Sequence, residues 1–126
     1  MMEVINSKNY VDKAETVILR LLEEDKKILS TSQLRKQLAM TAELTAQAER
    51  ETQAELSQKL QEQIEYLRVQ FVYQAGRELL VKKFIDKAGI IKILKSINGN
   101  REDFLTYCRY MEALVAYRKY HGPEDK

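Results

Sequence analysis

The sequence has very few of the residues that break helices, form disulfides or bind metals. Its 126 residues include one proline, four glycines, one cysteine, one histidine and no tryptophan. The single cysteine, Cys108, excludes an internal disulfide, and chains without disulfides are typical of reducing compartments. Because turn-forming residues are scarce and alanine, glutamate, lysine, leucine and glutamine are abundant, the chain is predicted to be helical nearly throughout.

Long apolar runs are also missing. No stretch approaches the roughly 20 apolar residues that a helix needs to cross a bilayer. The first ten residues, MMEVINSKNY, lack the basic-then-apolar order of a secretory signal peptide. We therefore expect a cytoplasmic protein that does not contact a membrane.

Apolar residues recur at helical spacing in five segments. Helices are expected over about 9–25, from Ser30 onward, over about 56–76, over 81–97 and over 100–121. Ser30 with Gln33 has the spacing of a capping box, Asn100 is placed to cap the last helix, and Asn9 or Ser7 is placed to cap the first.

These segments predict the fold class all-α, a compact five-helix bundle in a single helical domain that covers residues 1–126. The third helix is apolar on more than one face between Tyr66 and Tyr73, which predicts that it is the central helix of the bundle. A polar connection near 46–55 is expected to contain a break and would permit exchange of helices between copies. Residues 122–126 are expected to form a short disordered tail.

The side chains that enzymes use for chemistry are sparse and isolated. His121 stands just before Gly122 and Pro123, without sequence neighbours that would make a metal site or a general base, and is expected to face solvent. Cys108 falls on the apolar stripe of the last helix and is interpreted as a small buried hydrophobe. No glycine-rich phosphate loop or spaced set of metal ligands is present. We predict no catalytic residue, no metal and no cofactor, and therefore no enzyme.

The charge distribution points to a polyanionic partner more than the net charge of +2 does. Residues 1–65 hold 9 Lys/Arg and 12 Asp/Glu, whereas residues 66–126 hold 12 and 7. Arginines among tyrosines, as in Arg109-Tyr110 and Tyr117-Arg118, suit contacts with phosphates and stacking on bases. Ordinary solvation of a helical surface explains the same residues, so both interpretations stay open at this point.

A second nucleic-acid hypothesis concerns the capped helix start at Ser30–Gln37. A helix that opens with Ser, Gln, Arg and Lys resembles the recognition helix of a helix-turn-helix DNA-binding regulator. No short glycine-containing turn precedes it, which weighs against this hypothesis. A third hypothesis is a pure protein-interaction module that binds no nucleic acid.

Two long segments resemble one known family. The residues YLRVQFVYQAGRE at 66–78 and CRYMEALVAY at 108–117 are similar to the central and terminal helices of the small subunit of the type III-A CRISPR effector, the Csm complex. The starts NYVDKAE at 9–15 and TSQLR at 31–35 also fit, so the resemblance covers about residues 9–122.

The resemblance implies a non-catalytic, RNA-binding scaffold subunit that acts in antiviral defence. Several copies would form an inner filament that contacts the guide RNA–target RNA duplex, beside the backbone and large subunits of the complex. Arg68 and Arg77 are the first candidates for RNA binding. They lie nine residues apart, so only one of them is expected to face RNA while the other makes a core or inter-subunit ion pair. The full candidate set is Arg35, Lys36, Arg68, Arg77, Lys82, Lys83, Arg109, Arg118 and Lys119.

Overall fold

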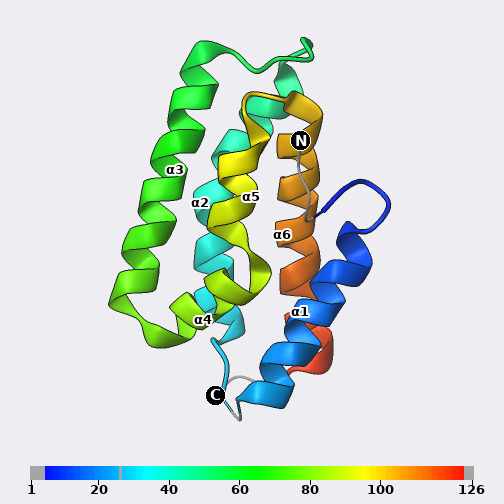
Figure 1. Ribbon diagram of the computed structural model, residues 1–126, viewed down its shortest axis with the longest axis vertical. Helices are drawn as coiled ribbons and strands as arrows, with labels where there is room; N and C mark the ends of the chain where they lie inside the picture. Colours follow the sequence, from blue (N-terminus) through cyan, green and yellow to red (C-terminus); the bar gives the residue numbers. More distant parts are fainter. Residues whose placement is uncertain (1–4, 26, 124–126) are drawn as a thin grey trace.

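A computed structural model describes residues 5–25 and 27–123 of the chain. This part contains six helices (Figure 1), which are α1 (Tyr10–Glu24), α2 (Thr31–Arg50), α3 (Gln58–Arg77), α4 (Leu79–Ala88), α5 (Ile90–Ile97) and α6 (Arg101–His121). The predicted all-α class is confirmed, but the predicted number of five helices is wrong. The segment expected to form one helix divides at Gly89, which caps the end of α4 and the start of α5. Its φ of +70° lies in the left-handed region, which glycine adopts without strain and which interrupts the helix.

The central helix of the bundle is α6. It packs against α1, α2 and α5, and its buried side chains include Phe104, Tyr107, Tyr110 and Met111. The Tyr107 hydroxyl lies 3.3 Å from the Thr41 hydroxyl, and the Tyr110 hydroxyl donates to the Ala88 carbonyl at 2.8 Å. Both buried tyrosine hydroxyls therefore have a hydrogen-bond partner, as buried polar groups require.

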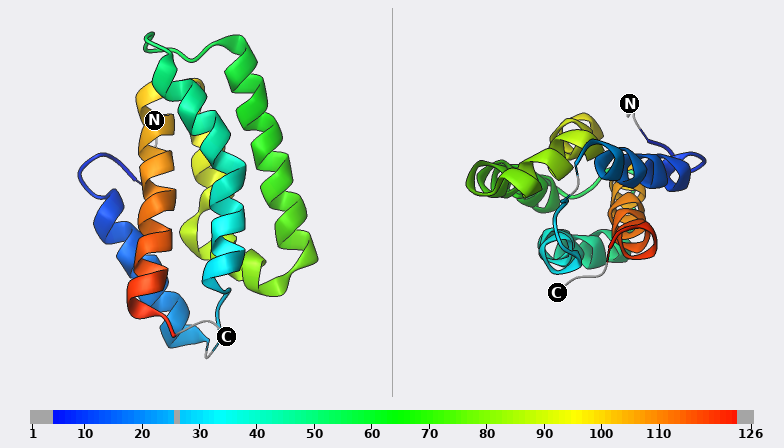
Figure 2. Two further views of the ribbon diagram at one scale, coloured as in Figure 1. Left: turned by 180° about the vertical axis from the view of Figure 1, so that it is seen from behind. Right: turned by 90° about the horizontal axis from the view of Figure 1, so that it is seen from below.

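The predicted central position of α3 is wrong. Its main apolar stripe is buried, at Leu60, Ile64, Leu67 and Phe71, but Tyr66, Val69, Val72 and Tyr73 are 55–64% exposed. Figures 1 and 2 show α3 at one edge of the bundle, where only one side of the helix has neighbours. The sequence pattern correctly identifies two apolar faces, and the fold of one chain covers only one of them.

The polar stretch at 46–55 divides between a helix and a loop. Helix α2 continues through residues 46–50, and residues 51–57 connect it to α3. The Ser57 backbone N–H and hydroxyl donate to the Glu51 carboxylate at 2.8 and 2.7 Å, and these bonds lower the pKa of Glu51. Backbone bonds from Leu56 N–H to the Gly99 carbonyl and from Arg101 N–H to the Ala54 carbonyl tie the loop to the start of α6.

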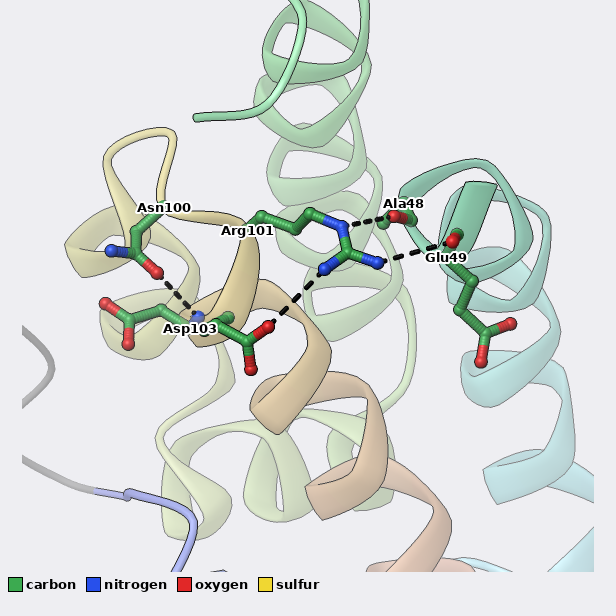
Figure 3. Close-up of polar contacts among 6 residues, drawn as sticks. Ala48, Glu49, Asn100, Arg101 and Asp103 are labelled. Carbon is green, nitrogen blue, oxygen red and sulfur yellow. Dashed lines mark hydrogen bonds and ion pairs between the residues drawn. The ribbon is translucent and has the colours of Figure 1, made fainter. Parts of the chain in front are cut away.

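Arg101 joins the end of α2 to the start of α6 (Figure 3). Its Nε donates to the Ala48 carbonyl at 2.8 Å and its Nη2 to the Glu49 carbonyl at 3.3 Å. The last carbonyls of a helix have no partner within the helix. The guanidinium supplies a donor to the Glu49 carbonyl and a second donor to the Ala48 carbonyl, which also accepts from the Glu51 N–H at 3.3 Å.

The capping predictions are confirmed at two helix starts. Ser30 and Gln33 form the reciprocal capping box, with distances of 3.0 and 2.8 Å, and the Asn100 side chain accepts from the Asp103 N–H at 2.9 Å. At α1 the Asn9 side chain accepts from the Asn6 N–H instead, so it does not cap the helix. Ser57 caps α3 by accepting from the Leu60 N–H, a cap that the sequence pattern did not predict.

Cys108 is buried, as predicted, and the Thr45 hydroxyl donates to its sulfur at 2.9 Å. Burial raises the pKa of the Cys108 thiol from 9.0 to about 12, and the hydrogen bond from Thr45 opposes this only in part. Burial also raises the pKa values of Tyr107 and Tyr110. A thiol held in its protonated form is a poor nucleophile.

Two glycines give a matched test of the Gly89 turn. A Cβ at Gly89 or at Gly76 would meet no atom within 4 Å, and only Gly89 has a positive φ. We expect Gly89→Ala to lower the free energy of unfolding by about 1 kcal/mol, because an L-residue is strained in the left-handed region. Gly76→Ala is expected to leave stability unchanged or raise it slightly. Urea denaturation at low protein concentration measures both; equal destabilisation would contradict the assignment of strain to Gly89.

The shifted thiol pKa predicts a loss of stability at alkaline pH. Between pH 9 and about 12 the unfolded thiol is ionised and the folded thiol is not, so the unfolded state binds fewer protons and stability falls as pH rises. The buried tyrosines act in the same direction. We expect the urea concentration at the unfolding midpoint to be lower at pH 10.5 than at pH 8, and this decrease to be smaller in Cys108→Ala.

The native Cys108 thiol should also resist iodoacetamide at pH 8. Rapid alkylation without unfolding would contradict its burial.

Candidate nucleic-acid interface

Seven of the nine predicted RNA-binding residues lie at one end of the bundle, six of them at its surface and one, Arg118, in its interior. In Figure 1 this is the lower end, where α2 begins, α3 and α6 end, and α4 lies. We call it the basic end; its members are Arg35, Lys36, Arg77, Lys82, Lys83 and Lys119.

Contacts between distant segments hold the basic end together. The Gln33 side-chain amide donates to the Glu78 carboxylate at 3.3 Å, which joins the start of α2 to the α3–α4 junction. Lys83 pairs with Asp25 at 3.0 Å, which joins α4 to the end of α1. Arg118 donates to the Leu29 carbonyl at 2.9 Å and so holds the last turn of α6 beside the segment that leads into α2.

The cations of the basic end differ in what they already bind. Lys82 pairs with Asp86 at 3.3 Å, and Lys83 with Asp25. Arg35, Lys36, Arg77 and Lys119 are exposed, and within residues 5–25 and 27–123 none of them has a carboxylate partner. The Arg77 guanidinium lies over the Tyr73 ring, 5.6 Å from its centroid. These four charges are available to an external anion.

Arg68 and Arg109 lie away from the basic end, in the middle of α3 and of α6. Arg68 pairs with Glu65 at 2.9 Å, and its side chain is 28% exposed. Arg68 therefore makes an ion pair and Arg77 faces solvent, but the ion pair is with a residue one turn away on α3 itself, whereas a core or inter-subunit pair was expected. Which of the two arginines faces RNA stays a prediction. Arg109 is exposed on α6.

Arg118 is an interior side chain. It is only 3% exposed, and besides Leu29 its guanidinium donates to the Pro123 carbonyl at 3.1 Å. A side chain so enclosed offers little to a phosphate outside the molecule, and we assign Arg118 to positioning the chain ends. The sequence spacing indicates this burial: Tyr107, Met111, Leu114 and Arg118 follow one another at intervals of four, three and four on the buried face of α6.

Residues 124–126 of the predicted tail lie outside the described residues.

His121 does not simply face solvent as predicted. Its Nε2 lies 2.7 Å from the Glu15 carboxylate, its side chain is 24% exposed, and its ring packs against Tyr117 and Tyr120. The contact ties the end of α6 to α1. Within the described part of the chain no group of His, Cys, Asp and Glu side chains is arranged to hold a metal ion.

An open cleft between α1 and α4 contains mainly paired charges. It is lined by Glu24, Asp25, Asp86, Lys83 and Lys87, together with Leu21. Lys87 pairs with Glu24 at 2.6 Å, in addition to the Lys83–Asp25 pair. These ion pairs link the two helices and leave no excess of positive charge for a nucleic acid in the cleft.

Several polar side chains of the Ser30–Gln37 segment, which a recognition helix would expose to DNA, are engaged or buried. Gln33 is committed to the capping box and to Glu78, and Leu34 and Gln37 are buried. Only Ser32, Arg35 and Lys36 remain exposed in the first two turns of α2. That set suits phosphate contacts better than the reading of base edges, which requires several exposed side chains at the N-terminus of the helix.

None of the helices among the described residues has the length and apolar character of a membrane-spanning segment.

Comparison with known proteins gives one consistent answer. The family model Csm2 Type III-A matches residues 5–124. A Streptococcus thermophilus protein named CRISPR system Cms protein Csm2 is 48% identical over 127 residues, which cover 98% of this chain and 100% of that protein. The protein of the same name from Mycobacterium tuberculosis is 44% identical over 120 residues, which cover 94% and 95%. That from Enterococcus italicus is 36% identical over 99 residues, which cover 77% and 71%. The chain therefore belongs to the Csm2 family of type III-A CRISPR systems, which confirms the resemblance to the small subunit of the Csm complex.

Proposed function

We propose that the chain is a non-catalytic, RNA-binding scaffold subunit of a type III-A CRISPR ribonucleoprotein in antiviral defence. Its partners are guide RNA, target RNA, the backbone and large subunits of the Csm complex, and other copies of itself. The copies form an inner filament along the guide–target duplex in the cytoplasm. The observation that carries this proposal is the family match over nearly the whole chain.

The basic end supports the RNA-binding part of the proposal. It presents Arg35 and Lys36 from α2, Arg77 from α3 and Lys119 from α6, on helices that are held together by hydrogen bonds and an ion pair. Fixed cations of this kind grip phosphates without reading bases. Base pairing with the guide supplies the sequence information, so a scaffold subunit needs only this type of grip. Lys82 would add charge after exchanging its present carboxylate partner for phosphate, and Lys83 would do the same.

Arg68, Arg109 and Arg118 take secondary places in the proposal. Arg109 offers an exposed charge in the middle of α6, and Arg68 must first release Glu65. Arg118 acts indirectly, since it fixes the segment next to α2 through Leu29. Cys108, one of the two side chains best suited to catalysis, is buried and its thiol pKa is raised by burial, which supports a non-catalytic role.

A pair of double variants tests the basic end. Arg35→Gln with Lys36→Gln removes two exposed charges from it, and Lys92→Gln with Lys95→Gln removes two exposed charges from α5 as a matched control. Fluorescence anisotropy with guide–target duplexes of unrelated sequence should show weaker binding by the first variant, by a similar factor for every sequence. The slope of log K against log salt should fall by roughly 0.7 to 0.9 for each lost phosphate contact. Equal losses in both variants, or a loss for one sequence only, would contradict the assignment.

Purification of the tagged chain from its native host tests the complex itself. Discrete short RNAs that co-elute with larger partner proteins are the expected result. Protein recovered in good yield at low salt, with neither RNA nor partners, would argue against the proposed function. Repeating the purification with the Arg35→Gln, Lys36→Gln variant separates the two kinds of partner, because the protein contacts should persist when RNA retention falls.

A further inference from the structure

A pocket lies between α1 and the turn that joins α4 to α5. Helix α1 packs against α4, and the right-hand view of Figure 2 shows the two side by side. The pocket is lined by α1 side chains between Asn9 and Arg20, by residues 87–89 and by Tyr110; we call it the α1 pocket. Its volume of about 400 Å³ is within the range of about 300–1,000 Å³ that is typical of ligand sites. It shares no residue with the basic end.

The floor of the α1 pocket is apolar and carries small groups. Val17, Ala88 and Gly89 form it together with the buried ring of Tyr110. A Cβ at Gly89 would meet no atom within 4 Å, so the space beside the backbone of the turn is open. Glycine allows a ligand to approach the backbone closely. The Tyr110 hydroxyl already donates to the Ala88 carbonyl, so the floor offers apolar surface and suits a planar ring.

The rim of the α1 pocket has more positive than negative charge. Lys13, Arg20 and Lys87 line the pocket, with Asp12 as the one carboxylate. Lys87 already pairs with Glu24 at 2.6 Å. Neither Lys13 nor Arg20 has a carboxylate partner in the described part of the chain.

The two rim cations without a partner stand on the same side of α1. Lys13 and Arg20 lie seven residues apart, which is about two turns of a helix. Thr16 lies between them, one turn from each, and is exposed. Two exposed cations beside an apolar floor create a positive potential that attracts an anion into the pocket.

We propose that the α1 pocket binds a nucleotide, with the base on the apolar floor and the phosphate held by Lys13 and Arg20. A base alone would leave the two cations without a partner, and a phosphate alone would leave the apolar floor exposed to water. A nucleotide matches both parts. Its sugar hydroxyls and base edges also offer hydrogen bonds to the Thr16 hydroxyl and the Asp12 carboxylate.

The nucleotide that occupies the pocket has two possible sources with the same chemistry. One is a free mononucleotide, and the other is an unpaired nucleotide of an RNA strand. A base inside a duplex is stacked and paired, so it does not reach the floor unless it leaves the stack. The inference goes beyond the proposed function and does not rest on it, because the residues of the basic end are not involved.

Nuclear magnetic resonance of the full, nuclease-treated chain tests the site directly. The chain has only four glycines, so the backbone amide signal of Gly89 is a specific reporter. Adenosine 5′-monophosphate should shift this signal saturably and leave that of Gly76, at the end of α3, unchanged. Adenosine lacks the phosphate and ribose 5-phosphate lacks the base, so each should bind at least about tenfold more weakly.

Variants separate the contact with the phosphate from the contact with the base. Lys13→Gln with Arg20→Gln removes the two rim cations and should weaken binding of adenosine 5′-monophosphate at least about tenfold. Thr16→Phe adds a ring that occupies the pocket, and should weaken binding without a change of charge. Leu19→Phe adds the same ring at a 40% exposed position outside the pocket lining and should bind normally. Far-UV circular dichroism checks that all three proteins remain folded.

Two RNA duplexes distinguish the sources of the nucleotide. One has a single unpaired nucleotide at its end, and the other is blunt. If the source is an RNA strand, the first duplex shifts the Gly89 signal further than the second, and Lys13→Gln with Arg20→Gln removes this difference. If the source is a free nucleotide, the two duplexes act alike and only the mononucleotide shifts the signal.

Three results overturn the inference. The first is a Gly89 signal that moves with none of adenosine 5′-monophosphate, uridine 5′-monophosphate and the duplex with the unpaired nucleotide. The second is an equally large shift with inorganic phosphate, which would show that the base is not recognised. The third is unchanged affinity for the mononucleotide and for the unpaired end in Lys13→Gln with Arg20→Gln.

Failure of the proposed function is recognised separately. The Arg35→Gln, Lys36→Gln variant should lose affinity for the blunt duplex and keep its affinity for adenosine 5′-monophosphate. A chain that binds the mononucleotide but no duplex refutes only the RNA-binding function. A chain that binds the duplexes without any shift of the Gly89 signal refutes only the nucleotide site.

Discussion

The bundle depends on burying α6, a helix that carries polar groups into the interior. Tyr107, Tyr110 and Arg118 are nearly inaccessible to water, and each finds its hydrogen-bond partner on a different element: Thr41 on α2, the Ala88 carbonyl at the end of α4, and the Leu29 carbonyl before α2. A buried polar group without a partner costs about 1–3 kcal/mol. The burial of α6 is therefore favourable only when α2, the α4–α5 turn and the 27–30 segment occupy their observed places.

This constraint also shapes the candidate interface. Arg118 holds the segment before α2, and the capping box at Ser30 fixes the direction in which α2 leaves it. Arg35 and Lys36, one turn further along, therefore point into solvent at the end of the bundle where α3 and α6 also finish. The buried arginine supports the exposed ones through backbone contacts, although its own charge does not reach the surface.

Sequence reasoning succeeded where a local rule determines the structure. Spacing and side-chain chemistry account for the capping box at Ser30, the cap at Asn100, the buried face of α3 and the buried Cys108.

Sequence reasoning failed where tertiary packing determines the structure. Two apolar faces made α3 look central, because periodicity identifies a face but not whether the same chain covers it. Gly89 was passed over because apolar spacing continues through 81–97 and φ is not visible in a sequence. Arg118 was counted with the surface cations because its residue type outweighed its position on the buried stripe. The six residues of the basic end could be nominated from the resemblance, but their convergence required the packing of four helices.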